Sequence, residues 1–479
     1  MTASELENLS KPELIAIILR FERRLGELEA EVAALRKRNA ELEAEVARLR
    51  KNSSNSSKPP ASDIVKPPKP PGIRGCRRKI GGQPGHPKHE REPFSLEELD
   101  DTRQYRLNRC PDCGGKVKPS GSDARVVQQI EVIERPVEVV EHRSEACWCP
   151  RCLKTFYAPL PPAVEKGGLA GPSLTAFVAY LKGVCHASFS TIRKFFRDVL
   201  KVTIARGQLA KLIGKVTASL AAMYDDLLAR LPGESRLNVD ETGHKEKGQP
   251  LWTWCFRANL YTLFKIDPSR SSAVLIEVLG KEFNGVLGCD SFSAYRKYMK
   301  DFNIAVQFCL AHLIRDVKFL TTLPDAVTRA YGERVLNGLR RLFRVIHRRD
   351  QMTPEQFQRA LERARQKLLA VGKRAPQRAE AQNLADRFRE HGAAYFQFIT
   401  TPGVEPTNNL AEQAMRFVVI DRLITQGTRS ERGRRWCERI WTAIATCAQQ
   451  GRSVFEFLQQ SITAYFHSQP TPSLLPSGP

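Results

Sequence analysis

The stretch RLNVDETG (236–243) is a short run of β-forming residues that ends at Asp240, and it opens the region that decides the fold. Two more strand-like stretches follow it, QPLWTWCFRANL (249–260) and YTLFKIDPS (261–269). The elements predicted after them are a helix in SSAVLIEVLG (271–280), a buried strand in FNGVLGCDSFSAY (283–295) that ends at Asp290, a strand in NIAVQFC (303–309) and a helix in AHLIRDVKFL (311–320).

Three strands, a helix, a strand and a strand–helix pair are the element order of an RNase H-like mixed α/β sheet. In that layout Asp240 and Asp290 end adjacent central strands and can converge on one point. A third acid must then come from a later helix. The run EPTNNLAEQ supplies it, with Asn408 and Asn409 as predicted helix caps and Glu412 one turn in.

Three convergent carboxylates are suited to divalent metal chemistry. They can hold two ions about 3.5–4 Å apart, and such a pair can clamp both oxygens of an in-line phosphoryl displacement. Hard oxygen ligands select Mg²⁺ or Mn²⁺ over zinc. Spacing alone does not single out one triad among 52 Asp and Glu residues, and Glu241, Asp316 and Asp421 are nearby alternatives.

The charge of the chain points to a long polyanion as partner. Its 479 residues include 75 Lys and Arg against 52 Asp and Glu, a formal net charge of +23. Nucleic acid is the leading candidate and an acidic membrane surface the second. No run of 18 apolar residues is present, which argues against a membrane span, and the start of the chain does not have the pattern of a secretory signal. We therefore expect a cytoplasmic, nucleoid-associated protein.

Residues 14–49 carry a heptad repeat. The first set of repeat positions is Leu14, Phe21, Leu28, Leu35, Leu42 and Leu49, and the companion set is Ile18, Leu25, Val32, Asn39 and Val46. One Asn among apolar residues favours a parallel two-stranded coiled coil in fixed register. The flanking pairs Arg24–Glu29, Glu31–Arg36, Arg38–Glu43 and Glu45–Arg50 are all opposite in sign. These patterns predict a homodimer, with a single amphipathic helix packed on its own core as the alternative.

A Ser-, Pro- and Lys-rich segment follows the heptads and is predicted to be an extended linker. It leads into a glycine-containing basic arm with Arg74, Arg77, Arg78 and Lys79. Such an arm either contacts DNA phosphates or is only solvated.

Twelve cysteines in a chain of this length suit a reducing compartment with one metal site. Two Cys-x-x-Cys pairs, Cys110 with Cys113 and Cys149 with Cys152, flank two β-alternating runs. Four thiolates match the tetrahedral geometry of structural Zn²⁺, and they leave no position open for catalysis. A zinc ribbon is therefore predicted here.

Three other features carry weaker signals. STIRKFFRDVL and RGQLAKLIGKV, joined by a short turn, fit a helix-turn-helix as well as an ordinary helical hairpin. Cys309 and His312 form a Cys-x-x-His motif, which has either a functional role or none beyond starting a helix. After the Glu412 helix, Arg429, Arg432, Arg434 and Arg435 stand among glycines; this favours contact with DNA phosphates over a solvated loop.

Taken together, long motifs in this chain resemble the transposases of insertion-sequence family sixty-six, the TnpC-type proteins of those bacterial elements. The matching motifs, in family order, are the heptad start, SSNSSKPPASD, GGQPGH, the CPDC and CPRC pairs, NVDETG, GCDSFSAYR, CLAHLIRD, PTNNLAEQAMR and the run from IDRLITQGTRS to VFEFL. By this resemblance Asp240, Asp290 and Glu412 are a DDE triad, in which Asp240 bridges two metals. The resemblance also implies companion proteins encoded by the same element.

We therefore predict a multidomain α+β protein. Its parts are a coiled coil (1–50), a disordered basic linker (51–100), a zinc ribbon (101–160), a helical DNA-binding region (165–232), an RNase H-like catalytic domain (233–428) with an all-helical insertion at about 325–398, and a basic C-terminal helical segment with its tail (429–479).

The leading functional hypothesis is a DDE transposase that uses two Mg²⁺ or Mn²⁺ ions and one structural Zn²⁺ to cut element ends and join them to target DNA. Two alternatives are a dimeric zinc-ribbon DNA-binding regulator with an inert core, and an RNase H-like nuclease or resolvase that cuts without joining. The heptad repeat is compatible with all three hypotheses and does not discriminate between them.

Overall fold

The computed structural model describes residues 10–49, 93–103, 105, 107, 109, 111–116, 126–130, 132–133, 136–151 and 153–475. The predicted basic arm with Arg74, Arg77, Arg78 and Lys79 lies outside these residues, as do the predicted zinc ligands Cys110 and Cys152. Within the described part of the chain, none of the helices combines the length and the apolar character needed to cross a membrane.

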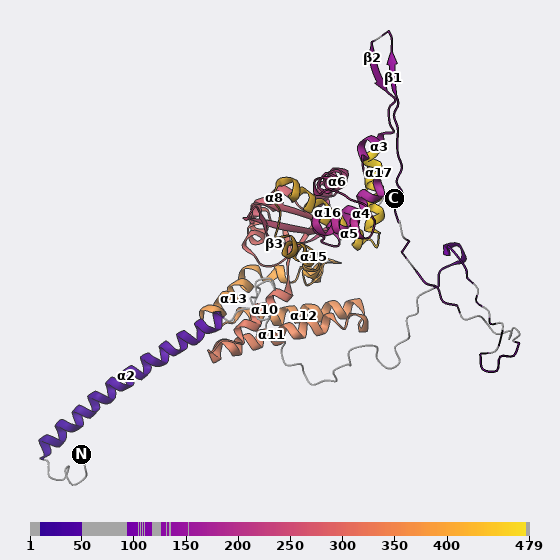
Figure 1. Cartoon of the computed structure of the whole chain (residues 1–479). Helices are drawn as coiled ribbons and strands as arrows, with labels where there is room; N and C mark the ends of the chain where they lie inside the picture. Colours follow the sequence, from indigo (N-terminus) through magenta and orange to yellow (C-terminus); the bar gives the residue numbers. More distant parts are fainter. Residues whose placement is uncertain are drawn as a thin grey trace.

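A five-stranded mixed sheet forms the centre of the molecule (Figure 1). Its strands are β3 (Arg236–Glu246), β4 (Gln249–Arg257), β5 (Thr262–Asp267), β6 (Val286–Cys289) and β7 (Ala305–Phe308), in the spatial order β5-β4-β3-β6-β7. The β3–β4 and β4–β5 pairs are antiparallel, whereas β3–β6 and β6–β7 are parallel. The mixed α+β character predicted from the sequence is confirmed.

The helices around these strands follow the predicted order, with one addition. The predicted helices are α8 (Ser272–Leu279), between β5 and β6, and α10 (Leu310–Leu320), after β7. The additional helix, α9 (Ser293–Phe302), connects β6 to β7. Parallel strands cannot be joined by a tight hairpin, so this connection needs a crossover.

Strand β3 is longer than the sequence pattern indicated. The prediction ended it at Asp240, but it continues to Glu246, which pairs with Gln249 of β4. Lys247 and Gly248 form the turn, with φ of 50° and 83°. Positive φ at both residues of a two-residue hairpin matches the twist of the strands it joins. Asp240 therefore lies in the middle of a strand.

Two C-terminal helices pack on the antiparallel half of the sheet. They are α15 (Asn409–Thr425), which contacts β3 and β4, and α16 (Glu431–Gln449), which contacts β5. The hydroxyls of Thr442 and Thr446 on α16 accept hydrogen bonds from the backbone N–H groups of Phe264 and Thr262, at 3.0 and 3.1 Å. Because β5 is an edge strand, these hydroxyls satisfy donors that no neighbouring strand reaches.

A helical layer joins two distant parts of the chain. Its members are α3 (Pro162–Gly167), α4 (Pro172–Gly183), α5 (Phe189–Asp198), α6 (Arg206–Ser219), α7 (Ala221–Arg230) and α17 (Val454–Phe466). Helix α17 packs on α3, α4 and α6, and α16 packs on α4, α6 and α7. The residues proposed from sequence as a helix-turn-helix form α5 and α6, which contact each other.

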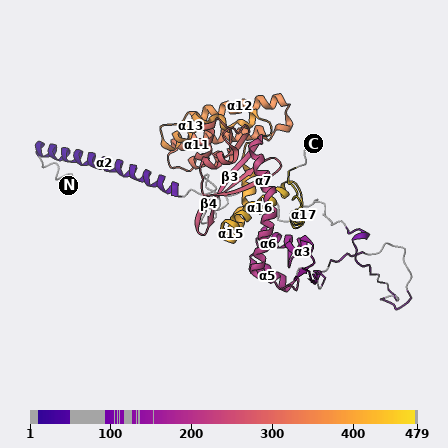
Figure 2. The same ribbon diagram turned by 90° about the horizontal axis from the view of Figure 1, so that it is seen from above.

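A second group of helices lies on the opposite side of the sheet from α5, α6 and α15, as seen from above (Figure 2). It consists of α11 (Ala326–Ile346), α12 (Pro354–Lys373), α13 (Ala379–His391) and the short α14 (Gln397–Thr400). The first three pack on one another, α10 contacts α11, and α14 contacts β7.

Helix α2 (Lys11–Leu49) projects from the core (Figure 1). None of its residues is buried, and one end is held to α13 by an ion pair of 2.7 Å between Arg48 and Glu380. Its heptad positions from Ile18 to Leu49 are exposed to solvent. The antiparallel strands β1 (Ala146–Cys149) and β2 (Lys154–Tyr157) stand away from the core in the same view.

Candidate active site

The sheet brings Asp240 and Asp290 to one edge of its parallel half. β3 pairs with β6 only from Arg236 to Asn238, opposite Val286 to Gly288, so the two strands separate just before Asp240. Asp290 directly follows β6, and Glu412 lies in the first turn of α15, which packs on β3. The three predicted acids therefore come from two neighbouring strands and one helix.

The Asp290 and Glu412 carboxylates act electrostatically on the carboxyl of Asp240. Burial raises the pKa of the Asp240 carboxyl well above its usual range, and the nearby Glu241, Asp290 and Glu412 carboxylates raise it further. A backbone hydrogen bond from the N–H of Glu241 to Asp240 Oδ1, at 3.0 Å, opposes this shift. Among the described residues, no Lys, Arg or His forms an ion pair with Asp240 or Asp290.

Asn408 connects the Glu412 helix to the Asp240 strand. Its side-chain Nδ2 donates to the carbonyl oxygen of Val239 at 2.8 Å, and its Oδ1 accepts from Nδ2 of Asn238 at 2.9 Å. Asn408 occupies the N-cap position of α15, but its side chain makes no capping hydrogen bond. The capping role predicted from sequence is therefore wrong for this side chain, which bonds across to β3 instead. Nothing in the sequence pattern indicated that partner.

The carboxylate of Glu241, a predicted alternative to the triad acids, accepts hydrogen bonds from two other side chains. Arg270 donates to its Oε1 from Nε and Nη2, at 3.0 and 2.8 Å, and the Tyr295 hydroxyl donates to Oε2. The guanidinium of Arg270 lies 4.4 Å from the ring centre of Trp252 and 3.9 Å from that of Phe292. Burial, followed by the Asp290 carboxylate, raises the pKa of Glu241 to about 7. Sequence reasoning did not identify Arg270 or Tyr295.

The other two alternative acids are also paired. Asp316 accepts from Arg387 at 2.7 Å. Asp421 contacts Nδ1 of His186 at 2.8 Å and accepts from the indole N–H of Trp441 at 3.1 Å. Asp421 thus ties α15 to the turn after α4 and to α16.

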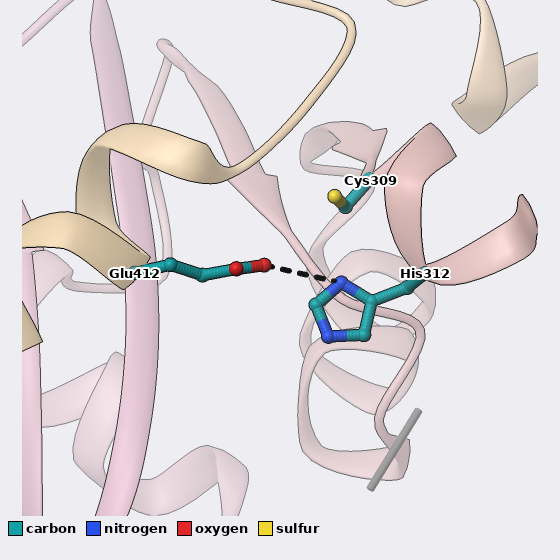
Figure 3. A group of neighbouring side chains, drawn as sticks. All are labelled: Cys309, His312 and Glu412. Carbon is teal, nitrogen blue, oxygen red and sulfur yellow. Dashed lines mark ion pairs between the residues drawn. The ribbon is translucent and has the colours of Figure 1, made fainter. Parts of the chain in front are cut away.

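Cys309 and His312 lie beside Glu412 (Figure 3). One possible ligand atom from each of the three residues lies within 4.8 Å of the other two. Among the described residues, no other group of three His, Cys, Asp or Glu side chains meets this criterion. Arg315 lies 3.5 Å from Glu412 Oε2 and 3.4 Å from Nε2 of His312.

The segment after α15 is fastened to the far end of β3. The backbone N–H of Thr428 donates to the carbonyl of Lys245 at 2.9 Å, and that of Lys247 donates to the Thr428 carbonyl at 3.0 Å. A Cβ on Gly427, whose φ is 83°, would meet the Lys245 carbonyl oxygen at 2.2 Å, so only glycine fits. Burial is the main reason that the pKa of His244, which contacts the Thr428 hydroxyl, is lowered to about 4.

A basic hollow of about 700 Å³ opens where this segment meets the helical layer. Its cationic lining consists of Lys182 on α4, Lys211 on α6, Arg429, and Arg432, Arg435 and Arg439 on α16. Three of the four arginines predicted to bind DNA thus line it, while Arg434 does not. Arg434 instead acts electrostatically on His244.

The described part of the predicted ribbon includes two of its four cysteines. Cys113 is exposed and Cys149 is partly buried. Cys149 ends β1, where it pairs with Lys154 of β2.

Comparison with known proteins extends this picture. Residues 167–435, more than half of the chain, match the family described as "Transposase IS66 family". Residues 108–152 match the "zinc-finger binding domain of transposase IS66", and residues 14–92 match a family of unknown function (DUF6444).

Two uncharacterized proteins of Sinorhizobium fredii are similar over long segments. One, y4jD, is 26% identical over 281 residues, which cover 53% of this chain and 52% of the relative. The other, y4qI, is 23% identical over 423 residues, which cover 81% of this chain and 76% of the relative. The chain thus spans about half the length of y4jD.

Proposed function

The chain belongs to the IS66 transposase family, and from this premise we propose that it is a metal-dependent DDE transposase that cuts and joins DNA. One observation carries the proposal: Asp240 lies in β3, Asp290 directly follows the neighbouring strand β6, and Glu412 lies in the first turn of α15, which packs on β3. Burial raises the pKa of Asp240, and the Glu241, Asp290 and Glu412 carboxylates raise it further. Like charges gathered in a buried place are costly unless a cation compensates them.

The catalytic core that we propose is RNase H-like. The strand order β5-β4-β3-β6-β7, with three antiparallel strands followed by two parallel ones, supports this assignment. The helix that carries Glu412 packs on β3, which carries Asp240.

The residues fit divalent ions with hard oxygen ligands. Asp240 and Asp290 make no ion pair within the described chain, in contrast to Glu241, whose carboxylate is held by Arg270. Asp240, Asp290 and Glu412 would hold Mg²⁺ or Mn²⁺, and the bound ions would supply electrostatic stabilisation of the phosphoryl charge in the transition state. The chain's own contribution is to place the carboxylates: Asn408 fixes the start of α15 against the strand that carries Asp240.

The reaction that we propose has two displacements at phosphorus. Hydrolysis of a phosphodiester bond frees the 3′-hydroxyl at each element end, and this hydroxyl then attacks a phosphodiester of the target DNA. Neither step needs a protein nucleophile or a covalent protein intermediate.

DNA is held, in this proposal, by the basic hollow between α6 and α16. Arginine and lysine side chains, together with the backbone N–H groups at the start of a 19-residue helix, are the groups that bind phosphates. A zinc ribbon built by Cys110, Cys113, Cys149 and Cys152 and a parallel coiled coil of two α2 helices complete the proposed assembly. Companion proteins of the same element remain part of the hypothesis.

The test uses purified protein, Mg²⁺, labelled DNA that carries the element's end, and a supercoiled target. Wild type is compared with Asp240→Asn, Asp290→Asn and Glu412→Gln. We expect nicked and joined products from wild type and neither from the variants, while all four proteins bind the end. Full activity in a variant would remove that residue from the triad. Nicking without joining would favour a nuclease or resolvase, and binding without cleavage by wild type would favour a regulator.

A further inference from the structure

Cys309, His312 and Glu412 come from two helix starts that face each other. Cys309 follows β7 and is the N-cap residue of α10, His312 lies one turn later, and Glu412 lies in the first turn of α15. Figure 3 shows the imidazole and the carboxylate pointing toward one another, with the thiol on the same side. One soft, one borderline and one hard ligand atom thus converge.

Two of these ligand atoms lack a hydrogen-bond partner among the described residues. His312 Nδ1 and Glu412 Oε1 are both buried without one, and they are 3.5 Å apart. That separation is too long for a good hydrogen bond. It matches the edge of a tetrahedral zinc site, because Zn–N and Zn–O bonds of about 2.0–2.1 Å at a tetrahedral angle place N and O about 3.4 Å apart.

The sulfur of Cys309 is buried beside backbone donors. It is 2% exposed and accepts a hydrogen bond from the backbone N–H of Asn408 at 3.1 Å. The pKa of Cys309 is raised, chiefly by burial and also by the Glu412 carboxylate, although backbone N–H groups of Asn408, His312 and Ala311 act in the opposite direction. A bound cation would lower the pKa of the thiol, as these donors do, because a metal ion favours deprotonation of the thiol that it binds.

We propose that Cys309, His312 and Glu412 bind a Zn²⁺ ion, separate from that of the ribbon. A sulfur, a nitrogen and an oxygen ligand select zinc over Mg²⁺. Three protein ligands leave the fourth tetrahedral position for water.

Glu412 belongs to both metal sites if the proposed function holds, and this consequence rests on that function. A carboxylate drawn to Zn²⁺ by Cys309 and His312 is withdrawn from the site formed with Asp240 and Asp290. Zinc is then an inhibitor of Mg²⁺-dependent cleavage, and it acts at a defined place rather than by general displacement of Mg²⁺.

Arg315 opposes the proposed ion. Its Nη1 lies 3.4 Å from His312 Nε2, and a guanidinium can only donate hydrogen bonds. Zinc on Nδ1 leaves the proton on Nε2, where it faces this donor. An Arg315→Gln variant offers a carbonyl oxygen that accepts from Nε2–H and removes a positive charge. We expect it to bind Zn²⁺ about tenfold more tightly than wild type.

The experiment is equilibrium dialysis of the full chain against buffered free Zn²⁺, with zinc measured by atomic emission. Wild type should hold one zinc more per chain than Cys309→Ser or His312→Ala, with Glu412→Gln weakened about tenfold or more. Cys447→Ser is the matched control, because Cys447 is also a buried thiol but lies on α16. It should retain the wild-type content, and thermal unfolding checks that each variant folds.

Equal zinc content in wild type, Cys309→Ser and His312→Ala would overturn the site. Unchanged affinity in Glu412→Gln would overturn the sharing of this residue, as would Mg²⁺-dependent nicking that is unaffected when the site is saturated with zinc. An unchanged or weaker affinity in Arg315→Gln would instead support a hydrogen-bonded relay from Arg315 through His312 to Glu412, and would refute zinc at Nδ1. Zinc binding needs neither DNA nor catalysis, so its outcome is independent of the transposase test.

Discussion

At the scale of single residues, Asn408 controls how the Glu412 helix sits against the Asp240 strand. An Asn408→Ala variant loses the hydrogen bonds to Val239 and Asn238 and leaves a buried carbonyl unsatisfied. We expect the free energy of unfolding to fall by about 1–3 kcal/mol. Strand cleavage should fall by about 100-fold, because a misplacement of about 1 Å in a catalytic group can have that effect. Denaturant unfolding and the nicking assay measure the two quantities.

The neighbouring Asn409 is the matched control for this variant. It is exposed at the first position of α15, and Asn409→Ala should change stability by less than about 0.5 kcal/mol. If Asn408→Ala lost stability yet cleaved DNA at the wild-type rate, the helix start would not position Glu412.

Glu241 makes the stability of the metal-free protein depend on pH. Its pKa is raised from 4.5 to about 7, chiefly by burial and then by Asp290. Between these two values the folded state holds a proton that the unfolded state releases, so this group's stabilising contribution is full below pH 4.5 and is lost as pH rises through about 7. Glu241→Gln cannot ionise, and its stability relative to wild type should therefore increase from acidic to mildly alkaline pH.

The measurement is urea unfolding in EDTA across this pH range. His244, with a pKa lowered to about 4, contributes a slope of opposite sign, but it is present in both proteins and cancels in the difference. Exposed Glu282 provides the control variant, Glu282→Gln, for which the difference from wild type should be flat. A flat difference for Glu241→Gln as well would contradict the raised pKa.

At the scale of elements, the sequence predicted what depends on local pattern. The three strands, the helix α8 and the later strands follow from apolar runs and their spacing, and each forms. The end of β3 was missed because pairing with β4 and the Lys247–Gly248 turn, rather than the β-propensity of RLNVDETG, decide where that strand stops. Helix α9 was missed because its residues followed directly on a buried strand.

In the candidate site, too, some features follow from local sequence pattern and others depend on the tertiary fold. Asp240, Asp290 and Glu412 could be proposed from the ends of elements and from family motifs. The cross-strand role of Asn408, the Arg270 and Tyr295 contacts to Glu241, and the approach of Glu412 to the Cys309–His312 pair could not. Each of these needs residues that lie far apart in sequence to meet in the fold.

Helix α2 presents an apolar stripe with no partner in the described chain, and a second copy is the partner that its heptads fit. A helix of 39 residues spans about 58 Å, and none of its residues is buried in the single chain. A helix of this length owes most of its stability to packing, so we expect a partner along its exposed stripe. Leu35→Glu places a charge in the predicted seam, where Leu35 is 62% exposed in the single chain. We expect a dimer to become a monomer in sedimentation experiments.

Lys37→Glu, on the opposite side of the same helix, is the control and should leave the dimer intact. If Leu35→Glu and wild type had the same mass in solution, then α2 would not be the dimerisation element, and the exposed stripe would need a different occupant.

At the scale of the whole molecule, part of the positive charge behind the net +23 is concentrated at one place on the fold. That place is the basic hollow, whose Lys and Arg side chains come from α4, α6, α16 and the segment before α16. The hollow therefore forms only when the helical layer and the C-terminal helices pack together. The packing of Arg432 against α6 illustrates this, because a Cβ on Gly214 would lie 3.1 Å from its Nη2. The hollow also adjoins the segment that is fastened to the far end of β3, the strand that carries Asp240.

The double variant Arg432→Gln/Arg435→Gln tests whether this hollow binds DNA. Each phosphate contact contributes about 0.9 to the slope of log affinity against log salt concentration, so the slope should become shallower by about 2. Affinity should fall to a similar degree for element ends and for unrelated DNA, because phosphate contacts carry no base information. Fluorescence anisotropy over a salt series measures both. Arg452→Gln removes an exposed arginine outside the hollow and should leave the slope unchanged; equal slopes in all three proteins would place the DNA elsewhere.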